Sequence, residues 1–398
     1  RDLLSFPTRR SSDLVTGFPW LPLTGALATV PVTVQTAAVT GIYGTGSLWV
    51  FSLYLLVLPF MQAKKIPPRK QVCLAALAVV TLGLLLGFGW LRVAHPVEHD
   101  PTGADSLAIL FVEGNVDQNQ KWIPSLQKQT VDHYVALTQD GLRDLKRTAP
   151  DEKPLILWSE TCMPFFFERS RLAGSVRSLA RESGCALLLG APALEEPERT
   201  DAPAEPVIYN RALLLGPSGG TIGTYDKEHL VPFGEYTPAF LHFSFLDPLL
   251  QGVGIYSEGK NRGPLTYQAM RAGMLICYEG IFPWLAQKRV AEGANILIDI
   301  SNDSWFAWTP ASRQHLYLTC LRAIEQNRWI LRGTNTGISA VVDTCGRIVT
   351  RGPLFTTGTV EAKAALIDTP SFFHRAAPWE TAALILLALT LCLTWRPH

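Results

Sequence analysis

The sequence has few charged residues for its length. Lys, Arg, Asp and Glu make up 17% of the 398 residues, whereas about 25% is typical of soluble domains. The 35 Lys and Arg residues balance 34 Asp and Glu, so the net charge is only +1. The absence of a basic excess argues against a broad nucleic-acid-binding surface. Hydrophobic residues make up 47%, and this combination predicts a membrane part joined to a soluble part.

The sequence also lacks paired cysteines. None of its seven cysteines forms a C-x-x-C pair, and Cys73 and Cys392 lie in apolar runs. This spacing predicts neither a disulfide framework nor a zinc site. A histidine cluster and a glycine-rich phosphate loop are missing as well, so we expect no metal and no cofactor. The odd number of cysteines leaves at least one free thiol.

A secretory signal is missing too. Residues 1–14 contain neither an apolar core nor a small-residue cleavage site. They resemble a translated sequencing adapter, and we expect them to be foreign to the protein. On this interpretation the chain is an N-terminally truncated fragment.

Three stretches are apolar enough to cross a membrane. Residues 43–62 and 72–91 carry no charge, and residues 379–395 carry only Glu380 near one end. Each is close to the ~20 residues that span ~30 Å of hydrocarbon. Buried core helices are the alternative for all three. Residues 17–40 are apolar but rich in Gly, Pro and Thr, which is typical of a re-entrant or interfacial segment.

The loop between the first two spans predicts the orientation in the membrane. It contains Lys64, Lys65, Arg69 and Lys70, and short loops rich in Lys and Arg stay in the cytoplasm. The soluble part should then lie on the outer side, and the last span should return the C-terminus to the cytoplasm. After the foreign segment, the expected units are a membrane domain at 15–95, a soluble domain at 96–375 and a C-terminal transmembrane helix at 376–398.

The soluble part alternates short β-rich runs with amphipathic helices, which is typical of an α/β sheet covered by helices. The Pro- and Glu-rich residues 191–206 should form a surface loop. The predicted strands are 107–112, 155–158, 186–190, 211–215, 274–277, 296–300 and 339–342. The predicted helices are 125–148, 171–183, 282–292 and 312–327.

Cys277 stands where an apolar run ends abruptly, and Pro283 is well placed to open a helix after it. A nucleophile on such a strand-to-helix turn is exposed, and backbone N–H groups there can point at a developing oxyanion. Its thiol would need a base or a cation nearby to ionise. A buried, inert cysteine is an equally good interpretation of this segment alone.

Glu160 follows another apolar strand, next to Trp158 and the aromatic run 165–167. Sheets of this class place ligands outside the carboxyl ends of their strands, and poor solvation favours a useful general base. A glutamate at a helix N-terminus is the alternative. Further on, Lys227 and Glu235 lie on a loop that mixes Lys, His, Pro and Gly. A lysine there could stabilise an oxyanion, although a solvated charge run is also possible.

In combination, these segments resemble the Glu-Lys-Cys triad of the nitrilase (carbon–nitrogen hydrolase) superfamily. Within it, the sequence is similar to the apolipoprotein N-acyltransferase family over about residues 15–395. The flanking apolar spans fit that family, whereas soluble nitrilases lack them. The segments that carry the resemblance are GFPW at 17–20, GNVDQNQKW at 114–122, LILWSET at 155–161, YDKEHLVPFGEYTP at 225–238, ICYEG at 276–280, SNDSWF at 301–306 and RGTNTGIS at 332–339.

The resemblance implies a four-layer α-β-β-α sandwich with flanking transmembrane helices. It also implies a multi-pass enzyme of the bacterial inner membrane with its catalytic domain on the periplasmic side. Such an enzyme transfers an acyl chain from a phospholipid, usually phosphatidylethanolamine, to the N-terminal amine of S-diacylglyceryl-cysteine in an apolipoprotein. The chemistry would be a ping-pong exchange through a cysteine thioester, without a cofactor.

By position, the resemblance implies that Glu160 is the base, Lys227 the oxyanion stabiliser and Cys277 the acylated nucleophile. The residues that match supporting positions around the site are Trp122, Glu235, Tyr278, Glu279, Asn302, Asp303 and Trp305. A lipid-facing entrance could come from the apolar residues 165–167, Phe240, Phe243, Phe245, Leu246, Leu249 and Leu250, for which core packing is an equal alternative.

Two departures from the family pattern stand out. Family members have about eight spans, of which three are found here, and Glu113 and Ser159 replace residues that are common there. Two other interpretations therefore stay open. One is a membrane-anchored amidase that hydrolyses small amides with the same triad. The other is an inactive, truncated scaffold that retains the fold.

Overall fold

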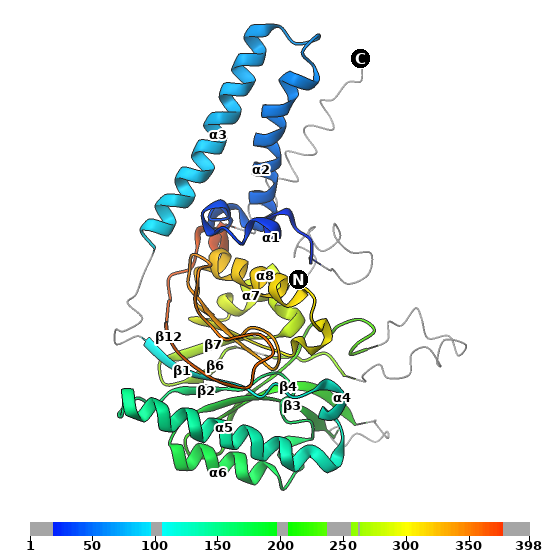
Figure 1. The fold of residues 1–398 in the computed structure, drawn as a ribbon, viewed down its shortest axis with the longest axis vertical. Helices are drawn as coiled ribbons and strands as arrows, with labels where there is room; N and C mark the ends of the chain where they lie inside the picture. Colours follow the sequence, from blue (N-terminus) through cyan, green and yellow to red (C-terminus); the bar gives the residue numbers. More distant parts are fainter. Residues whose placement is uncertain (1–18, 97–105, 197–205, 237–255, 262, 377–398) are drawn as a thin grey trace, which may run out of the picture.

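The computed structural model describes residues 19–96, 106–196, 206–236, 256–261 and 263–376. Its main body is a sandwich of two six-stranded β-sheets, from one end of which a pair of long helices projects (Figure 1). The predicted C-terminal span at 379–395 and the foreign-looking residues 1–14 lie outside the described residues.

The first sheet has the strand order β12-β1-β2-β3-β4-β5. Its centre, β1 to β3, is parallel, and its other pairs are antiparallel. The strands are β1 (Ser106–Glu113), β2 (Leu155–Leu157), β3 (Leu187–Glu195), β4 (Val207–Leu215), β5 (Thr221–Asp226) and β12 (Gly358–Ala365).

The second sheet repeats this plan in the order β11-β10-β9-β8-β7-β6. The parallel centre is β7 to β9, and the flanking pairs are antiparallel. The strands are β6 (Leu265–Tyr267), β7 (Met270–Ile276), β8 (Ile296–Ser301), β9 (Ile330–Thr334), β10 (Ala340–Val342) and β11 (Ile348–Arg351).

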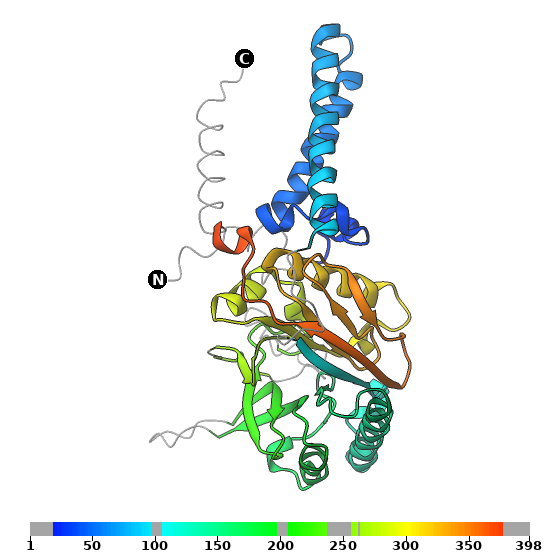
Figure 2. The same cartoon turned by 90° about the vertical axis from the view of Figure 1, so that its left-hand side faces the viewer.

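Two helices cover the outer face of each sheet (Figures 1 and 2). Helices α5 (Gln127–Thr148) and α6 (Ala173–Ser183) pack on the first sheet, and α7 (Pro283–Ala291) and α8 (Ala311–Gln326) on the second. A third apolar cluster fills the space between the sheets. This arrangement confirms the predicted α-β-β-α sandwich.

The predicted surface loop at 191–206 was partly wrong. β3 continues to Glu195 and pairs with β4 as far as Val207. The strand is therefore longer than its Pro and Glu content suggested. Pro192 is tolerated because β2 pairs with β3 only at Leu187 and Leu188, so β3 has β4 alone as its neighbouring strand at Pro192.

The projecting pair consists of α2 (Ala37–Met61) and α3 (Pro68–Ala94). Within the described residues, these are the two helices long and apolar enough to span a bilayer. They coincide with the first two apolar spans of the sequence. Many of their apolar side chains are exposed; Phe60, for example, is 79% exposed. Such an apolar exterior needs an apolar environment.

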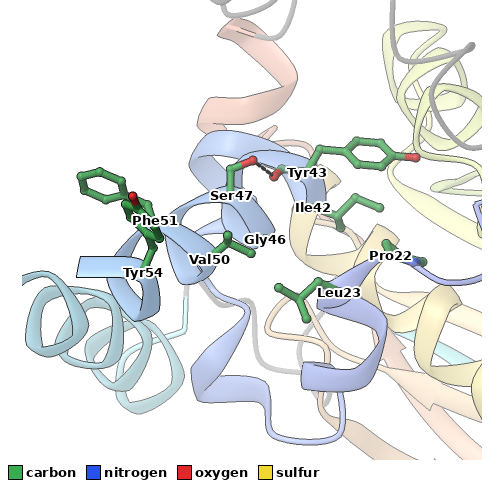
Figure 3. A pocket seen from close by; sticks show the side chains of 9 residues that line it. All are labelled: Pro22, Leu23, Ile42, Tyr43, Gly46, Ser47, Val50, Phe51 and Tyr54. Carbon is green, nitrogen blue, oxygen red and sulfur yellow. Dashed lines mark hydrogen bonds between the residues drawn. The ribbon is translucent and has the colours of Figure 1, made fainter. Parts of the chain in front are cut away.

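The segment 17–40 was predicted to be re-entrant or interfacial. Its described part contains the short helix α1 (Leu23–Leu27), a 3₁₀ turn at Pro31–Thr33 and the start of α2. A cavity of about 510 Å³ lies there, between α1 and the first half of α2 (Figure 3). It is lined mainly by apolar and aromatic side chains, among them Ile42, Tyr43 and Phe51.

The foot of α2 is joined to the sandwich through α8. The backbone N–H of Ile42 donates to Oε1 of the buried Glu325 at 2.9 Å. This bond is possible because α2 is interrupted at Gly41, whose φ of 65° is left-handed. A Cβ at Gly41 would also meet the Phe373 ring at 2.6 Å. Helix α2 therefore rests on the same helix, α8, that packs on the second sheet, and α3 packs against α2.

Candidate active site

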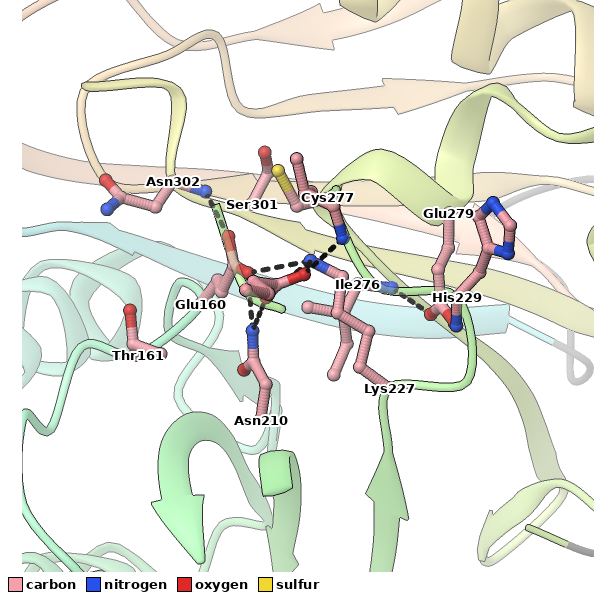
Figure 4. Close-up of polar contacts among 12 residues, drawn as sticks. Glu160, Thr161, Asn210, Lys227, His229, Ile276, Cys277, Glu279, Ser301 and Asn302 are labelled. Carbon is pink, nitrogen blue, oxygen red and sulfur yellow. Dashed lines mark hydrogen bonds and ion pairs between the residues drawn. The ribbon is translucent and has the colours of Figure 1, made fainter. Parts of the chain in front are cut away.

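The strand ends of both sheets meet at one place, where polar side chains gather (Figure 4). Glu160 follows β2 and Lys227 follows β5 in the first sheet. Cys277 follows β7 and Asn302 follows β8 in the second. The structure thus brings together the three residues that the sequence singled out as a triad.

Glu160 is held by three donors. Its Oε1 accepts from the Nδ2 of Asn210 at 2.8 Å and from the Nζ of Lys227 at 3.4 Å. Its Oε2 accepts from the backbone N–H of Asn302 at 2.9 Å. The carboxylate therefore bridges the two sheets. It is only 6% exposed, so a proton moved there is shielded from bulk water.

Lys227 lies between two carboxylates and is fully buried. Its Nζ donates to the Oε1 of Glu235 at 2.9 Å, besides its contact with Glu160. Burial alone would lower the pKa of this ammonium, but Glu235 and Glu160 outweigh burial and hold the pKa well above its usual value. Lys227 is thus a fixed cation, and Glu235 is the second acidic residue that keeps it charged.

Cys277 occupies a strained backbone position. Its φ is 54°, in the left-handed region that non-glycine residues rarely adopt. The backbone is held on both sides: its N–H donates to the Oδ1 of Asp299 at 3.1 Å, and its carbonyl lies 3.1 Å from the Nε2 of His315. Backbone strain that neighbouring hydrogen bonds hold in place is typical of functional sites.

The electrostatics favour a protonated thiol at rest. Burial raises the pKa of Cys277, the charge of Glu160 raises it further, and Lys227 opposes both. A neutral thiol that faces a carboxylate needs that carboxylate to take its proton before it can attack. The pair therefore suits nucleophilic catalysis with a general base.

Glu279 connects the cysteine turn with the lysine loop. Its carboxylate is fully buried and accepts the N–H of Ile276 at 2.8 Å, just before the cysteine. It also accepts the N–H of Glu228 and of His229, just after Lys227, and the hydroxyl of Tyr225. Burial raises its pKa to about 7, and the N–H donors oppose that shift. Glu279 thus sets the spacing between nucleophile and cation.

Asp303 lies behind the nucleophile rather than beside it. It is fully buried and pairs with Arg332, which also binds Asp299. Burial would raise the pKa of Asp303, but Arg332 and His315 hold it well below its usual range. This network orders β8, β9 and α8 around the cysteine turn. Asp303 therefore supports the site from behind, rather than facing a substrate.

The three aromatic positions differ in exposure. Trp122 is 44% exposed and Trp305 is 72% exposed, so both are available to an apolar ligand. Tyr278 is buried and stacks on the His229 ring, with centroids 5.6 Å apart. Its ring therefore packs the lysine loop against the cysteine turn.

The lipid-facing entrance predicted at 165–167 is wrong for two of its three residues. Phe165 and Phe167 are buried in the core beneath α6. An aromatic run shows no face preference in sequence, and here alternate rings turn inward. The other proposed entrance residues, Phe240, Phe243, Phe245, Leu246, Leu249 and Leu250, lie outside the described residues.

Sequence reasoning missed two buried polar residues at the site. Asn210, on β4, donates to both Glu160 and Glu235 at 2.8 Å and so holds the two carboxylates around Lys227. Lys121 lies next to Trp122 and donates to the hydroxyl of Thr161. Asn210 could have been found as the lone amide at the start of an apolar run. Lys121 could have been found inside the GNVDQNQKW segment.

A Gly190→Ala substitution should displace the base. A Cβ at Gly190 would lie 2.5 Å from the backbone N of Thr161 and 2.8 Å from the Cα of Glu160. Because backbone cannot rotate away as a side chain can, the strand end must shift. A shift of ~1 Å can cost about 10²-fold in rate. Gly174→Ala, on α6 with open space around it, is the matched control and should leave the rate unchanged.

Several known proteins are similar to this chain. The carbon–nitrogen hydrolase family matches residues 146–369. The apolipoprotein N-acyltransferase of Geobacter metallireducens is 36% identical over 91% of this chain and 67% of its own length. That of Brucella melitensis is 33% identical over 94% and 68%. The crystal structure of a carbon–nitrogen hydrolase from Helicobacter pylori has 15% identity and a TM-score of 0.47, over 71% of this chain and 94% of that one.

Proposed function

Since the chain belongs to the apolipoprotein N-acyltransferase family and carries its carbon–nitrogen hydrolase domain, we propose that it acylates apolipoproteins through a thioester on Cys277. The observation that carries the proposal is the strained cysteine turn facing the buried pair of Glu160 and Lys227.

In the first half-reaction, Glu160 takes the proton of the Cys277 thiol, and the sulfur attacks the ester carbonyl of the acyl donor. Lys227 has three N–H bonds, and Glu235 and Glu160 accept two of them. The third, with the backbone N–H of Tyr278, can bind the oxyanion. The carbon–oxygen bond then breaks, Glu160 returns its proton to the leaving alkoxide, and the acyl group stays on sulfur.

In the second half-reaction, the amine of the apolipoprotein attacks the thioester. Glu160 accepts a proton from the amine, the carbon–sulfur bond breaks, and Cys277 is released as the thiol. The product is an amide, which is more stable than the thioester, so no ATP is needed. Both halves use the same oxyanion site, which is why one cation suffices.

The substrates are a lipid and a lipoprotein, as for the family in general. We take the donor to be a phospholipid, with phosphatidylethanolamine as the expected head group. Support comes from α2 and α3, whose apolar exteriors suit a bilayer. Helix α2 rests on α8, which packs against the cysteine turn, so the site would lie close to the bilayer that holds the acyl donor.

The proposed location is the bacterial inner membrane, with α2 and α3 spanning it and the sandwich on the periplasmic side. The loop that joins the two helices carries Lys64 and Lys65, and Arg69 and Lys70 follow in the first turn of α3. Those charges favour the cytoplasmic side for the loop, and the sandwich lies at the opposite end of the helices (Figure 2).

Two-substrate kinetics test the transfer. The protein is placed in phosphatidylethanolamine vesicles with a synthetic S-diacylglyceryl-cysteine peptide, and N-acylation of the peptide is followed by mass spectrometry. A thioester intermediate gives parallel double-reciprocal lines, and a Cys277→Ala variant gives no product. Intersecting lines would contradict the two-step exchange. Release of free fatty acid at the same rate without the peptide would favour a hydrolase instead.

A further inference from the structure

Lys121 is a buried lysine that the mechanism above does not use. It ends the short helix α4 (Gln118–Lys121), and its side chain is almost completely buried. Within the described residues, no carboxylate forms an ion pair with it. A buried charge without such a partner is strongly destabilising. A lysine at this position therefore lowers the stability of the fold, and packing does not explain why it is there.

The ammonium group of Lys121 instead clamps the backbone that carries the base. Its Nζ donates to the hydroxyl of Thr161 at 2.6 Å and to the carbonyl of Glu160 at 3.3 Å. Thr161 has a φ of 43°, which is a genuine outlier for a β-branched residue. The clamp therefore acts on the strained peptide directly after Glu160.

The surroundings of Lys121 also couple its charge to the reacting groups. The ionisable groups that face it are Glu160, Cys162 and Cys277. Burial lowers its pKa to about 8, and those three groups oppose the shift. The ammonium is therefore charged at neutral pH and loses its charge as the pH rises through about 8.

We propose that Lys121 is a positioning residue for acyl transfer: it holds the Glu160–Thr161 peptide so that the base meets Cys277, and its charge favours the cysteine thiolate. The inference rests on the proposed function, because it assigns Lys121 a part in the same reaction. It adds a second buried lysine to a site whose triad contains one.

A Lys121→Met variant tests this inference, because methionine keeps most of the length of the unbranched side chain and removes its charge and donors. We expect the single-turnover rate of Cys277 acylation to fall about 10²-fold, as for a misplaced catalytic group. Lys128→Met, an exposed lysine at the start of α5, is the matched control and should keep the wild-type rate.

The pH profile separates positioning from mere folding. The wild-type rate should fall as the pH rises through about 8, because Lys121 then loses its charge. The methionine variant has no charge to lose at this position, so its rate should not show this fall at high pH. The proposal would be overturned if the methionine variant kept the same fall in rate at high pH, or if its rate stayed within threefold of wild type. Wild-type acylation in the same assay reports on the proposed function independently.

Thr161→Val provides a second route if Lys121→Met does not fold. Valine keeps the branched shape and removes only the hydroxyl that Lys121 binds. We expect the acylation rate to fall about tenfold, because one of the two hydrogen bonds that Lys121 donates is lost. The melting temperature should stay close to that of wild type. A Thr161→Ser variant keeps the hydroxyl and should restore the rate. Equal rates for valine and serine would contradict the clamp.

Discussion

A Glu160→Gln variant should lose about 10³–10⁴-fold in the rate of Cys277 acylation, near the upper range for a general base. Glutamine has the size of glutamate and can keep the hydrogen bond from the N–H of Asn302. It cannot accept the thiol proton. The burial that raises the pKa of Cys277 then leaves the nucleophile protonated throughout the neutral range.

The measurement is a quenched single turnover with phosphatidylethanolamine, in which hydroxylamine-sensitive acyl groups on the protein are counted against time. Glu182→Gln, an exposed glutamate on α6, serves as the control and should be indistinguishable from wild type. If Glu160→Gln acylated within tenfold of the wild-type rate, the proton would have to go elsewhere, and Glu160 would not be the base.

Arg332→Met should destabilise the protein by about 3–5 kcal/mol, the usual result of removing one partner from a buried ion pair. Arg332 is fully buried and binds Asp299 and Asp303, which are also fully buried. Methionine would leave both carboxylates without their cation. Asp299 also accepts the N–H of Cys277, so the cysteine turn should loosen along with the core.

Chemical denaturation in detergent, followed by tryptophan fluorescence, gives the change in stability. Arg313→Met, which removes an exposed arginine from the start of α8, should change the unfolding free energy by less than about 0.5 kcal/mol. A loss below about 1 kcal/mol for Arg332→Met would mean that the two aspartates are neutral in the folded protein. They would then not form the charged network described here.

Local sequence patterns located most of the sandwich. All seven predicted strands and all four predicted helices of the soluble part have counterparts, because their apolar runs are bounded by turns and their helices are amphipathic. Five strands were missed: β5, β6, β9, β11 and β12. In two of them the reason is plain: Thr221–Asp226 mixes polar residues and glycine, and Ile330–Thr334 places an arginine in a fully buried strand. That arginine, Arg332, is tolerated only because two aspartates from other segments meet it.

Glu160 and Cys277 could be located because each follows an apolar strand, and Lys227 because it lies on a loop that mixes Lys, His, Pro and Gly. The contacts that each of them makes could not be derived, because pairing between distant segments leaves no local pattern in the sequence. Asn210 donates to Glu160, which lies 50 residues earlier in the sequence, and Glu279 accepts the N–H of His229, also 50 residues earlier. Nor could the pairing of β1 with β12 be derived, since Ser106 meets Ala365 only in the folded sheet.

Acylation of Cys277 itself is the most direct test. The protein is incubated with phosphatidylethanolamine in vesicles, digested, and the peptide that contains Cys277 is analysed by mass spectrometry with and without hydroxylamine. We expect one acyl group on Cys277, removed by hydroxylamine and by the diacylglyceryl peptide, and absent from Glu160→Gln. A folded, membrane-embedded protein whose Cys277 stays unmodified, or an acyl group found on another residue, would contradict a thioester at this site.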